Sequence, residues 1–168
     1  PYVESKNINI VFDTYIEELK IRCDPESMER VILNLLSNAI KFTDNNGNIS
    51  VFIEADEKYV FIRVKDDGIG ISEDIREEIF NRFVQEDKSF NRKKEGSGIG
   101  LALVKSLVEL HDGEVYLEKV SKGSEFVVKL PNIKIHEELD VYNKVMDAES
   151  KPLVQKIHIE FSDIYELY

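Results

Sequence analysis

Cysteine, tryptophan and proline are scarce in this sequence of 168 residues, and basic residues are outnumbered. The single cysteine, Cys23, excludes a disulfide within the chain and is expected to be a small core residue, because it lies between apolar positions and an Asp-Pro pair. No apolar run approaches the ~20 residues that a membrane-spanning helix needs, and no signal-peptide pattern opens the chain. The 33 acidic residues against 22 basic ones give a net charge of −11, which argues against a broad nucleic-acid surface.

We expect a cytoplasmic domain that contacts neither nucleic acid nor membrane. The chain begins at Pro1 rather than Met, so the sequence leaves open whether a longer parent protein is membrane-anchored. The acidic balance does not exclude a single anionic ligand held by a local cluster of basic residues.

The spacing of apolar residues predicts alternating strands and helices. A long helix is expected to start at Asp24-Pro25, a capping residue followed by a proline suited to the first helical position, and to end near Phe42. Shorter helices are expected from Ser72 to about Phe83 and over 100–111. The expected strands cover 7–13, 19–23, 49–55, 59–65, 114–120 and 124–130.

This order of elements predicts an α+β fold, a two-layer α/β sandwich with a mixed sheet and helices on one face. The predicted domain covers residues 1–131. Residues 132–168 are rich in charge and are expected to form a linker or tail. The alternation at 156–161 predicts an additional strand there, and a frayed tail is the open alternative.

The helix over 25–42 carries two asparagines four residues apart, Asn34 and Asn38, and this spacing places both on one face with Lys41 nearby. Amide oxygens suit Mg²⁺, which takes few protein ligands and leaves its other positions to phosphate and water. The plain alternative is the polar side of an amphipathic helix.

Asp66 ends an apolar strand and is followed by Gly68 and Gly70. Glycines there let the backbone turn sharply and approach a ligand closely. A carboxylate at such a position can accept a hydrogen bond from an exocyclic amine, such as adenine N6. An ordinary Asp-Asp-Gly turn is the alternative.

Gly96, Gly98 and Gly100 open the predicted helix over 100–111, where backbone N–H groups and the helix dipole favour an anion. This is neither the dinucleotide-binding fingerprint nor a Walker loop, because no strand precedes it and no Lys-Ser/Thr pair ends it. A basic cluster precedes the glycines and is suited to contact phosphates. The alternative interpretation is a solvated loop without a ligand. The members of the cluster are Lys88, Arg92, Lys93 and Lys94.

Together these segments resemble the catalytic, ATP-binding domain of sensor histidine kinases, within the wider fold of gyrase B, Hsp90 and MutL. Residues 34–42 (NLLSNAIKF) resemble the N box and 64–71 (VKDDGIGI) the G1 box. Residues 79–83 (IFNRF) resemble the F box and 96–101 (GSGIGL) the G2 box. The stretch 85–92 (QEDKSFNR) is similar to the lid of hybrid-type kinases.

The resemblance implies a role for each matching residue. Asn38 would be the chief Mg²⁺ ligand with Asn34 beside it, and Asp66 would read adenine N6. Lys41 and Arg92 would contact phosphates, and Phe80 and Phe83 would anchor a lid over about 84–97. The remaining nucleotide-binding positions implied are Phe42, Gly68, Gly70, Ile71, Phe83, Gly96, Ser97, Gly98, Ile99, Gly100 and Leu101.

Related ATPases place a glutamate four residues before the metal-binding asparagine, where it activates water. Here that position is Asn34, so the resemblance implies a histidine kinase that binds Mg·ATP and transfers the γ-phosphate to a histidine. A nucleotide-sensing module and a gyrase-type ATPase are the alternatives.

The implied partners are a dimerisation domain that carries the phosphoacceptor histidine and a response-regulator receiver domain, in a two-component phosphorelay. His111 closes a predicted helix, where a cation has a structural role. His136 only faintly resembles an acceptor and follows the catalytic domain, and His158 lies in the tail. The chain alone is therefore expected to bind ATP without completing autophosphorylation.

Overall fold

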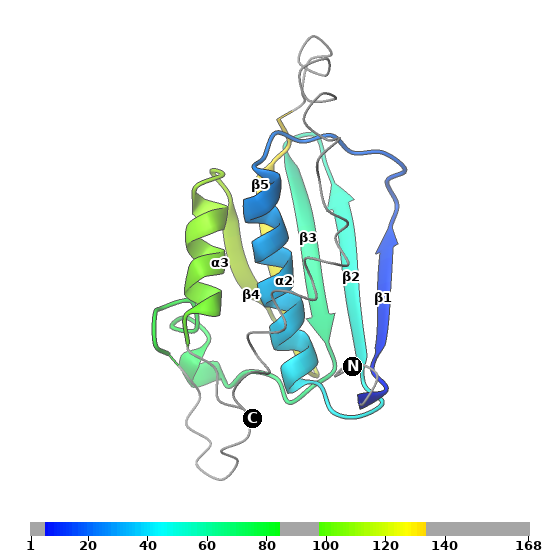
Figure 1. Ribbon diagram of the computed structural model, residues 1–168, viewed down its shortest axis with the longest axis vertical. Coiled ribbons are helices and arrows are strands. Elements are labelled where there is room, and N and C mark those ends of the chain that lie inside the picture. Colours follow the sequence, from blue (N-terminus) through cyan, green and yellow to red (C-terminus); the bar gives the residue numbers. More distant parts are fainter. Residues whose placement is uncertain (1–5, 85–97, 134–168) are drawn as a thin grey trace. The chain divides into compact units, whose positions relative to one another are not determined.

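The computed structural model describes residues 6–84 and 98–133 (Figure 1). The chain divides into two compact units, Pro1–Leu19 with Cys23–Asn132, and Lys20–Arg22 with Ile133–Tyr168. The first unit holds all the helices and strands described below. These are β1 (Asn9–Thr14), α2 (Pro25–Phe42), β2 (Asn48–Ala55), β3 (Tyr59–Asp66), the 3-10 turn η1 (Glu73–Ile75), α3 (Gly100–Glu109), β4 (Glu114–Glu118) and β5 (Ser124–Pro131).

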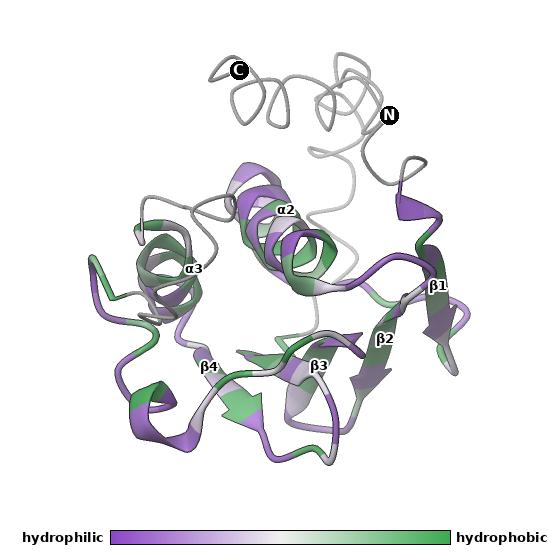
Figure 2. Cartoon of the chain, turned by 90° about the horizontal axis from the view of Figure 1, so that it is seen from below, coloured by the Kyte–Doolittle hydropathy of each residue, from purple (hydrophilic) through white to green (hydrophobic). Residues whose placement is uncertain are grey.

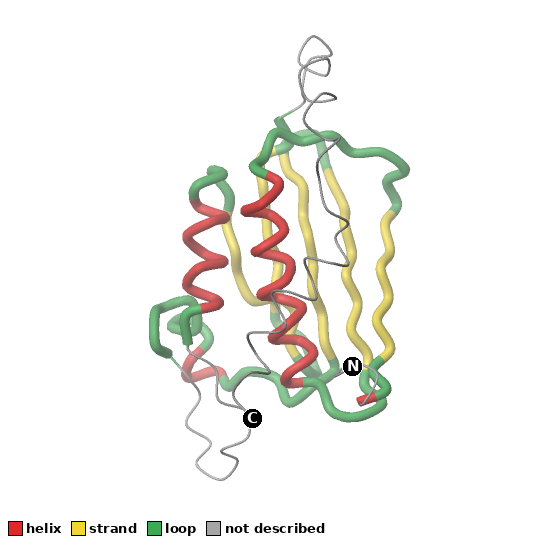
Figure 3. Tube along the Cα trace, in the orientation of Figure 1, coloured by secondary structure: helices red, strands yellow, loops and turns green. Residues whose placement is uncertain are grey.

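The strands form one mixed sheet in the order β1-β2-β3-β5-β4 (Figure 3). β1 pairs in parallel with β2, and the other neighbours are antiparallel. The register aligns Ile49 with Asp66 and Asp66 with Ser124, so the end of β3 lies between the starts of β2 and β5. β1 begins, β3 ends and α2 ends at the same end of this unit (Figure 1).

The two helices lie over one face of the sheet, with their apolar sides toward it (Figure 2). This arrangement follows from period-2 alternation in the strands and apolar spacing of three to four residues in the helices. It buries side chains from every described helix and from the three central strands. They include Val31, Leu35, Ile49, Val51, Val60, Val64, Ala102, Val104, Val108, Phe126, Val128 and Leu130. The predicted α+β two-layer sandwich is confirmed.

The long helix begins where the sequence predicts. Pro25 occupies the first turn, and the Asp24 carboxylate accepts a hydrogen bond from the Ser27 N–H at 3.0 Å. His111 joins this end of α2 to the last turn of α3. Its Nε2 accepts from the Asp24 N–H at 2.9 Å, and its Nδ1 lies 2.7 Å from the Leu107 carbonyl. His111 therefore has a structural role, in which it links the end of α3 to the start of α2.

Three local expectations are wrong. Residues 19–23 form no strand, because the chain leaves β1 after Thr14 and these residues pair with none of the five strands of the sheet. The helix expected over 72–83 is reduced to η1 and turns, because Phe80 packs on Phe126 of the sheet instead of continuing a helix. Cys23 is half-buried rather than a core residue, and this burial raises the pKa of its thiol.

Within the described ranges, no helix combines the length and apolar character needed to cross a bilayer. The predicted boundary after residue 131 stays a prediction, and the strand expected at 156–161 lies outside the described residues.

Candidate nucleotide-binding site

The amide of Asn34 on α2 is oriented by its own helix. Its Nδ2 donates to the Arg30 carbonyl at 2.9 Å, which leaves Oδ1 directed away from that carbonyl. A Cβ added to Gly100 would lie only 2.8 Å from this Oδ1. The first residue of α3 therefore lies close to the Asn34 oxygen, and a side chain at position 100 would require this amide to shift.

Asn38 lies one turn further along α2 and is half-buried, like Asn34. The apolar positions between them, Leu35 and Leu36, are buried, so the two amides occupy the polar side of the helix. At the end of the helix, Lys41 Nζ lies 5.2 Å from the centre of the Phe42 ring. The spacing of the two asparagines thus gives the shared face that the sequence predicts.

The carboxylate of Asp66 is buried at the end of β3, with only 4% of the residue exposed. Its Oδ1 accepts a hydrogen bond from the Gly68 N–H at 2.9 Å. The backbone N–H and hydroxyl of Ser124 are further partners, but desolvation outweighs them, and burial raises the pKa of this carboxyl. A carboxylate oxygen has more than one lone pair, so this buried group is chemically suited to accept a further hydrogen bond from an amino group of a ligand.

The turn after Asp66 rests directly on the last residue of α2. A Cβ on Gly68 would overlap the Phe42 carbonyl, and the Ile69 N–H donates to that same oxygen at 3.3 Å. Gly70 follows with φ +72, a conformation that favours glycine. The structure thereby brings the asparagine helix and the aspartate turn into contact.

Gly123 is a site residue that the sequence analysis missed. It has φ +72, and a Cβ there would overlap the carbonyl of Asp66. In the sequence, Gly123 stands only as a residue between the two expected strands 114–120 and 124–130. Gly123 reaches Asp66 because it precedes Ser124, which pairs with Asp66 in the sheet. This register cannot be predicted from the local sequence.

The residues on either side of segment 85–97 meet. The Phe83 N–H donates to the Gly98 carbonyl at 3.0 Å, and both residues have positive φ, +66 and +67. Phe80 is held edge-on against Phe126 with ring centres 6.1 Å apart, whereas Phe83 is 74% exposed. Phe80 is thus the anchored member of this pair.

Several predicted positions lie outside the described residues, namely Lys88, Arg92, Lys93, Lys94, Gly96 and Ser97. Ile99 precedes α3 and supplies no side-chain cap to it, so the first amides of that helix have no capping side chain from this residue. Ile71 and Leu101 are half-buried beside these elements. The individual roles of all these residues stay predictions.

No cluster of three or more His, Cys, Asp or Glu residues that could hold a metal occurs in the part of the chain that the structure describes. The candidate metal ligands are instead amide oxygens. The outward Oδ1 of Asn34 fits the preference of Mg²⁺ for oxygen ligands.

A family model described as "Histidine kinase-, DNA gyrase B-, and HSP90-like ATPase" matches residues 23–134. The chain belongs to this family. The resemblance seen in the four sequence motifs is confirmed, and the matched range covers α2, α3 and every strand except β1.

Relatives within the family are histidine kinases. Histidine kinase P4 of Formosa agariphila is 38% identical over 137 residues, which is 77% of this chain and 10% of that protein. The circadian input-output histidine kinase CikA of Synechococcus elongatus is 41% identical over 111 residues, 66% of this chain and 15% of that protein. The chain therefore spans only a small part of these curated relatives.

Solved structures give the same family. The catalytic domain of histidine kinase ThkA superposes with a TM-score of 0.69 at 28% identity, covering 77% of this chain and 84% of that one. Full-length ShkA in complex with AMPPNP gives a TM-score of 0.69 at 29% identity, covering 81% of this chain and 28% of that one. The helix layer and mixed sheet are thus the fold of histidine kinase catalytic domains.

Proposed function

We propose that this chain binds Mg·ATP and donates the γ-phosphate to a histidine on a separate dimerisation domain, in two-component signalling. The observation that carries the proposal is the convergence of three elements. The amide face of α2, the buried Asp66 carboxylate and the first residue of α3 come together at one end of the helix layer.

Each element has a chemical role in this proposal. The Asp66 carboxylate accepts a hydrogen bond from the exocyclic amine of adenine, which adds a donor to a buried group whose pKa burial has raised. Asn34 and Asn38 hold the metal through neutral oxygens that do not repel the phosphates. Mg²⁺, when bound, offsets negative charge on the phosphate oxygens. The start of α3 favours an anion at its N–H groups.

Position 34 favours transfer to a histidine over hydrolysis. An asparagine amide cannot accept a proton at neutral pH, and its Nδ2 is occupied by the Arg30 carbonyl. Without a general base at this position, water at the γ-phosphate is not activated by α2. The chain then contributes positioning and charge stabilisation, and the nucleophile comes from another domain.

The acceptor histidine is proposed to lie outside this chain. Both ring nitrogens of His111 are occupied between the helices, and His136 and His158 lie outside the described residues. The relatives are much longer proteins, and ThkA has been solved in complex with the response regulator TrrA. We infer a dimerisation domain of the same parent protein and a receiver domain as partners.

The experiment that tests this function is a calorimetric titration with a non-hydrolysable ATP analogue, with and without Mg²⁺. Wild type is expected to bind in the micromolar range and to need Mg²⁺, and Asp66→Asn is expected to lose binding. Absence of binding by the wild type would overturn the proposal. Asn34→Glu is the matched test of kinase against hydrolase, because it restores the carboxylate that water activation requires.

A further inference from the structure

The last turn of α2 ends without the glycine that usually caps a helix. Thr43 follows the helix in an extended conformation (φ −81, ψ 137), and its N–H donates to the Ala39 carbonyl at 2.9 Å. The carbonyls after Ala39 then have no partner within the helix, as at any helix end. Their partners must come from elsewhere in the chain.

Lys6 supplies most of those partners from more than 30 positions upstream. Its Nζ donates to the carbonyls of Ile40 at 2.9 Å, Lys41 at 3.1 Å and Thr43 at 2.7 Å. An ammonium has three donors, which is enough for one hydrogen bond to each of these three carbonyls. Its positive charge also lies at the negative end of the helix dipole.

The backbone around Lys6 is fastened to the loop after α2. The Lys6 carbonyl accepts from the Asn46 N–H at 2.9 Å, and Asn7 Nδ2 donates to Asn46 Oδ1 at 2.8 Å. The Asn9 N–H then donates to the Gly47 carbonyl at 3.0 Å as β1 begins. Backbone and side-chain hydrogen bonds therefore join the segment before β1 to the loop that follows α2.

The turn at this helix end carries residues of the proposed nucleotide site. Phe42 lies between the Lys41 and Thr43 carbonyls that Lys6 holds, and its own carbonyl accepts from the Ile69 N–H of the aspartate turn. Displacement of this turn would therefore move Lys41, Phe42 and the support of Gly68 together.

We propose that Lys6 is a positioning residue for the nucleotide, which fixes the last turn of α2 so that Lys41 and Phe42 stand where the ligand requires them. This inference rests on the proposed function. It also makes the segment before β1 a mechanical connection to the nucleotide site, because a shift of Lys6 is transmitted to three carbonyls of α2.

The test compares wild type, Lys6→Met and Lys58→Met in the full chain, by calorimetric titration with AMPPNP and Mg²⁺. Lys58 is the matched control, since it is exposed in the turn between β2 and β3, at the opposite end of the sheet. Lys6→Met is expected to raise the Kd about threefold to fivefold, as expected for loss of a charge at a helix terminus. Hydrogen exchange of the Ile69 amide is expected to accelerate as well. Lys58→Met is expected to change neither.

An unchanged Kd for folded Lys6→Met, with only a lower Tm, would overturn the inference, because a purely structural residue gives that result. If Lys6→Met does not fold, Lys6→Gln decides, since an amide keeps two donors without the charge. A raised Kd for this variant supports the inference, and a wild-type Kd overturns it. If the wild type does not bind AMPPNP, both the proposed function and this inference are wrong. If the wild type binds and the Lys6 variants bind equally well, only this inference is wrong.

Discussion

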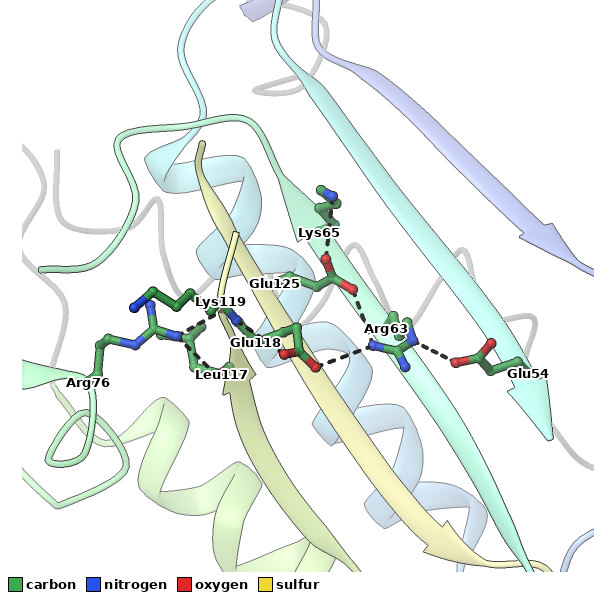
Figure 4. A network of polar contacts seen from close by, with 8 residues as sticks. All are labelled: Glu54, Arg63, Lys65, Arg76, Leu117, Glu118, Lys119 and Glu125. Atoms are coloured by element: carbon green, nitrogen blue, oxygen red, sulfur yellow. Dashed lines mark hydrogen bonds and ion pairs between the residues drawn. The ribbon is translucent and has the colours of Figure 1, made fainter. Parts of the chain in front are cut away.

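The two faces of the sheet use the same strands but are held by different interactions. Under α2 and α3, Val64 and Phe126 face each other in the register and are 1% and 4% exposed. On the face that no described helix covers, Arg63 of β3 bridges Glu54 and Glu125 with N···O distances of 2.7 and 3.3 Å (Figure 4). Lys65 adds a further ion pair to Glu125 at 3.4 Å.

This difference indicates which face of the sheet contributes most to stability and where the proposed site lies. Apolar burial on the helix side contributes most of the free energy of folding, whereas partly exposed ion pairs contribute little each. The proposed site lies at the end of the apolar side, where Asp66 is the charged residue buried among the core positions. That carboxylate is therefore expected to matter more for binding than for folding.

The largest effect is expected in the core. Leu35 is fully buried in α2, and Leu35→Ala removes its contacts with the sheet side of the domain and leaves a cavity. The free energy of unfolding is expected to fall by about 2–5 kcal/mol, measured by urea denaturation. A loss under about 1 kcal/mol would contradict the assignment of this face as the source of stability.

The next effect is expected at the contact between Gly123 and Asp66. Gly123→Ala places a Cβ against the Asp66 carbonyl in a left-handed conformation, which costs about 1–2 kcal/mol before any displacement of the strand end. Stability and AMPPNP affinity are both expected to fall. Lys122→Ala in the same turn is the control, because its ion pair with Asp67 at 3.6 Å is exposed and its loss is expected to change neither markedly.

The buried Asp66 carboxyl is expected to make the stability of the domain depend on pH. Burial raises the pKa of this carboxyl in the folded chain, so the folded state retains the proton to higher pH than the unfolded state. The contribution of this group to stability is therefore largest at low pH and declines as pH rises from the ordinary aspartate pKa through the raised one. Unfolding measured against pH for wild type and Asp66→Asn isolates this decline as the difference in slope. Equal slopes would show that the carboxyl titrates normally.

The smallest effect is expected on the uncovered face. Arg63→Met keeps an apolar stem over the sheet but removes the ion pairs to Glu54 and Glu125. Stability is expected to fall by about 0–1 kcal/mol and the loss to shrink as salt is added, in denaturation at two ionic strengths. A loss above about 2 kcal/mol that salt does not change would contradict the contrast between the two faces.

Local signals were sufficient for the elements whose causes lie within a few residues. The capping pair Asp24-Pro25 predicted the start of α2, and alternation predicted the strands β2 and β3. The spacing of Asn34 and Asn38 and the position of Asp66 at a strand end were likewise readable. These features depend on helix period, strand period and turn chemistry, which sequence carries directly.

The remaining features depend on contacts between distant segments. In the segment where a helix was expected over 72–83, Phe80 packs on Phe126, and Arg76 also donates to the carbonyls of Leu117 and Glu118 at 3.1 and 3.0 Å (Figure 4). The role of Gly123 follows from the register of β3 with β5, and the role of Lys6 from its distance to α2. Local propensity does not contain such tertiary contacts.

The hydrogen bond between Phe83 and Gly98 also has a consequence for chain length. It fixes the distance between the two residues that flank segment 85–97, whatever the number of residues between them. The entropy of closing a flexible loop grows slowly with length, by about 0.6 kcal/mol for each doubling. A change in the number of residues between Phe83 and Gly98 is therefore expected to cost little free energy of loop closure, so this hydrogen bond defines where the segment begins and ends without defining its length.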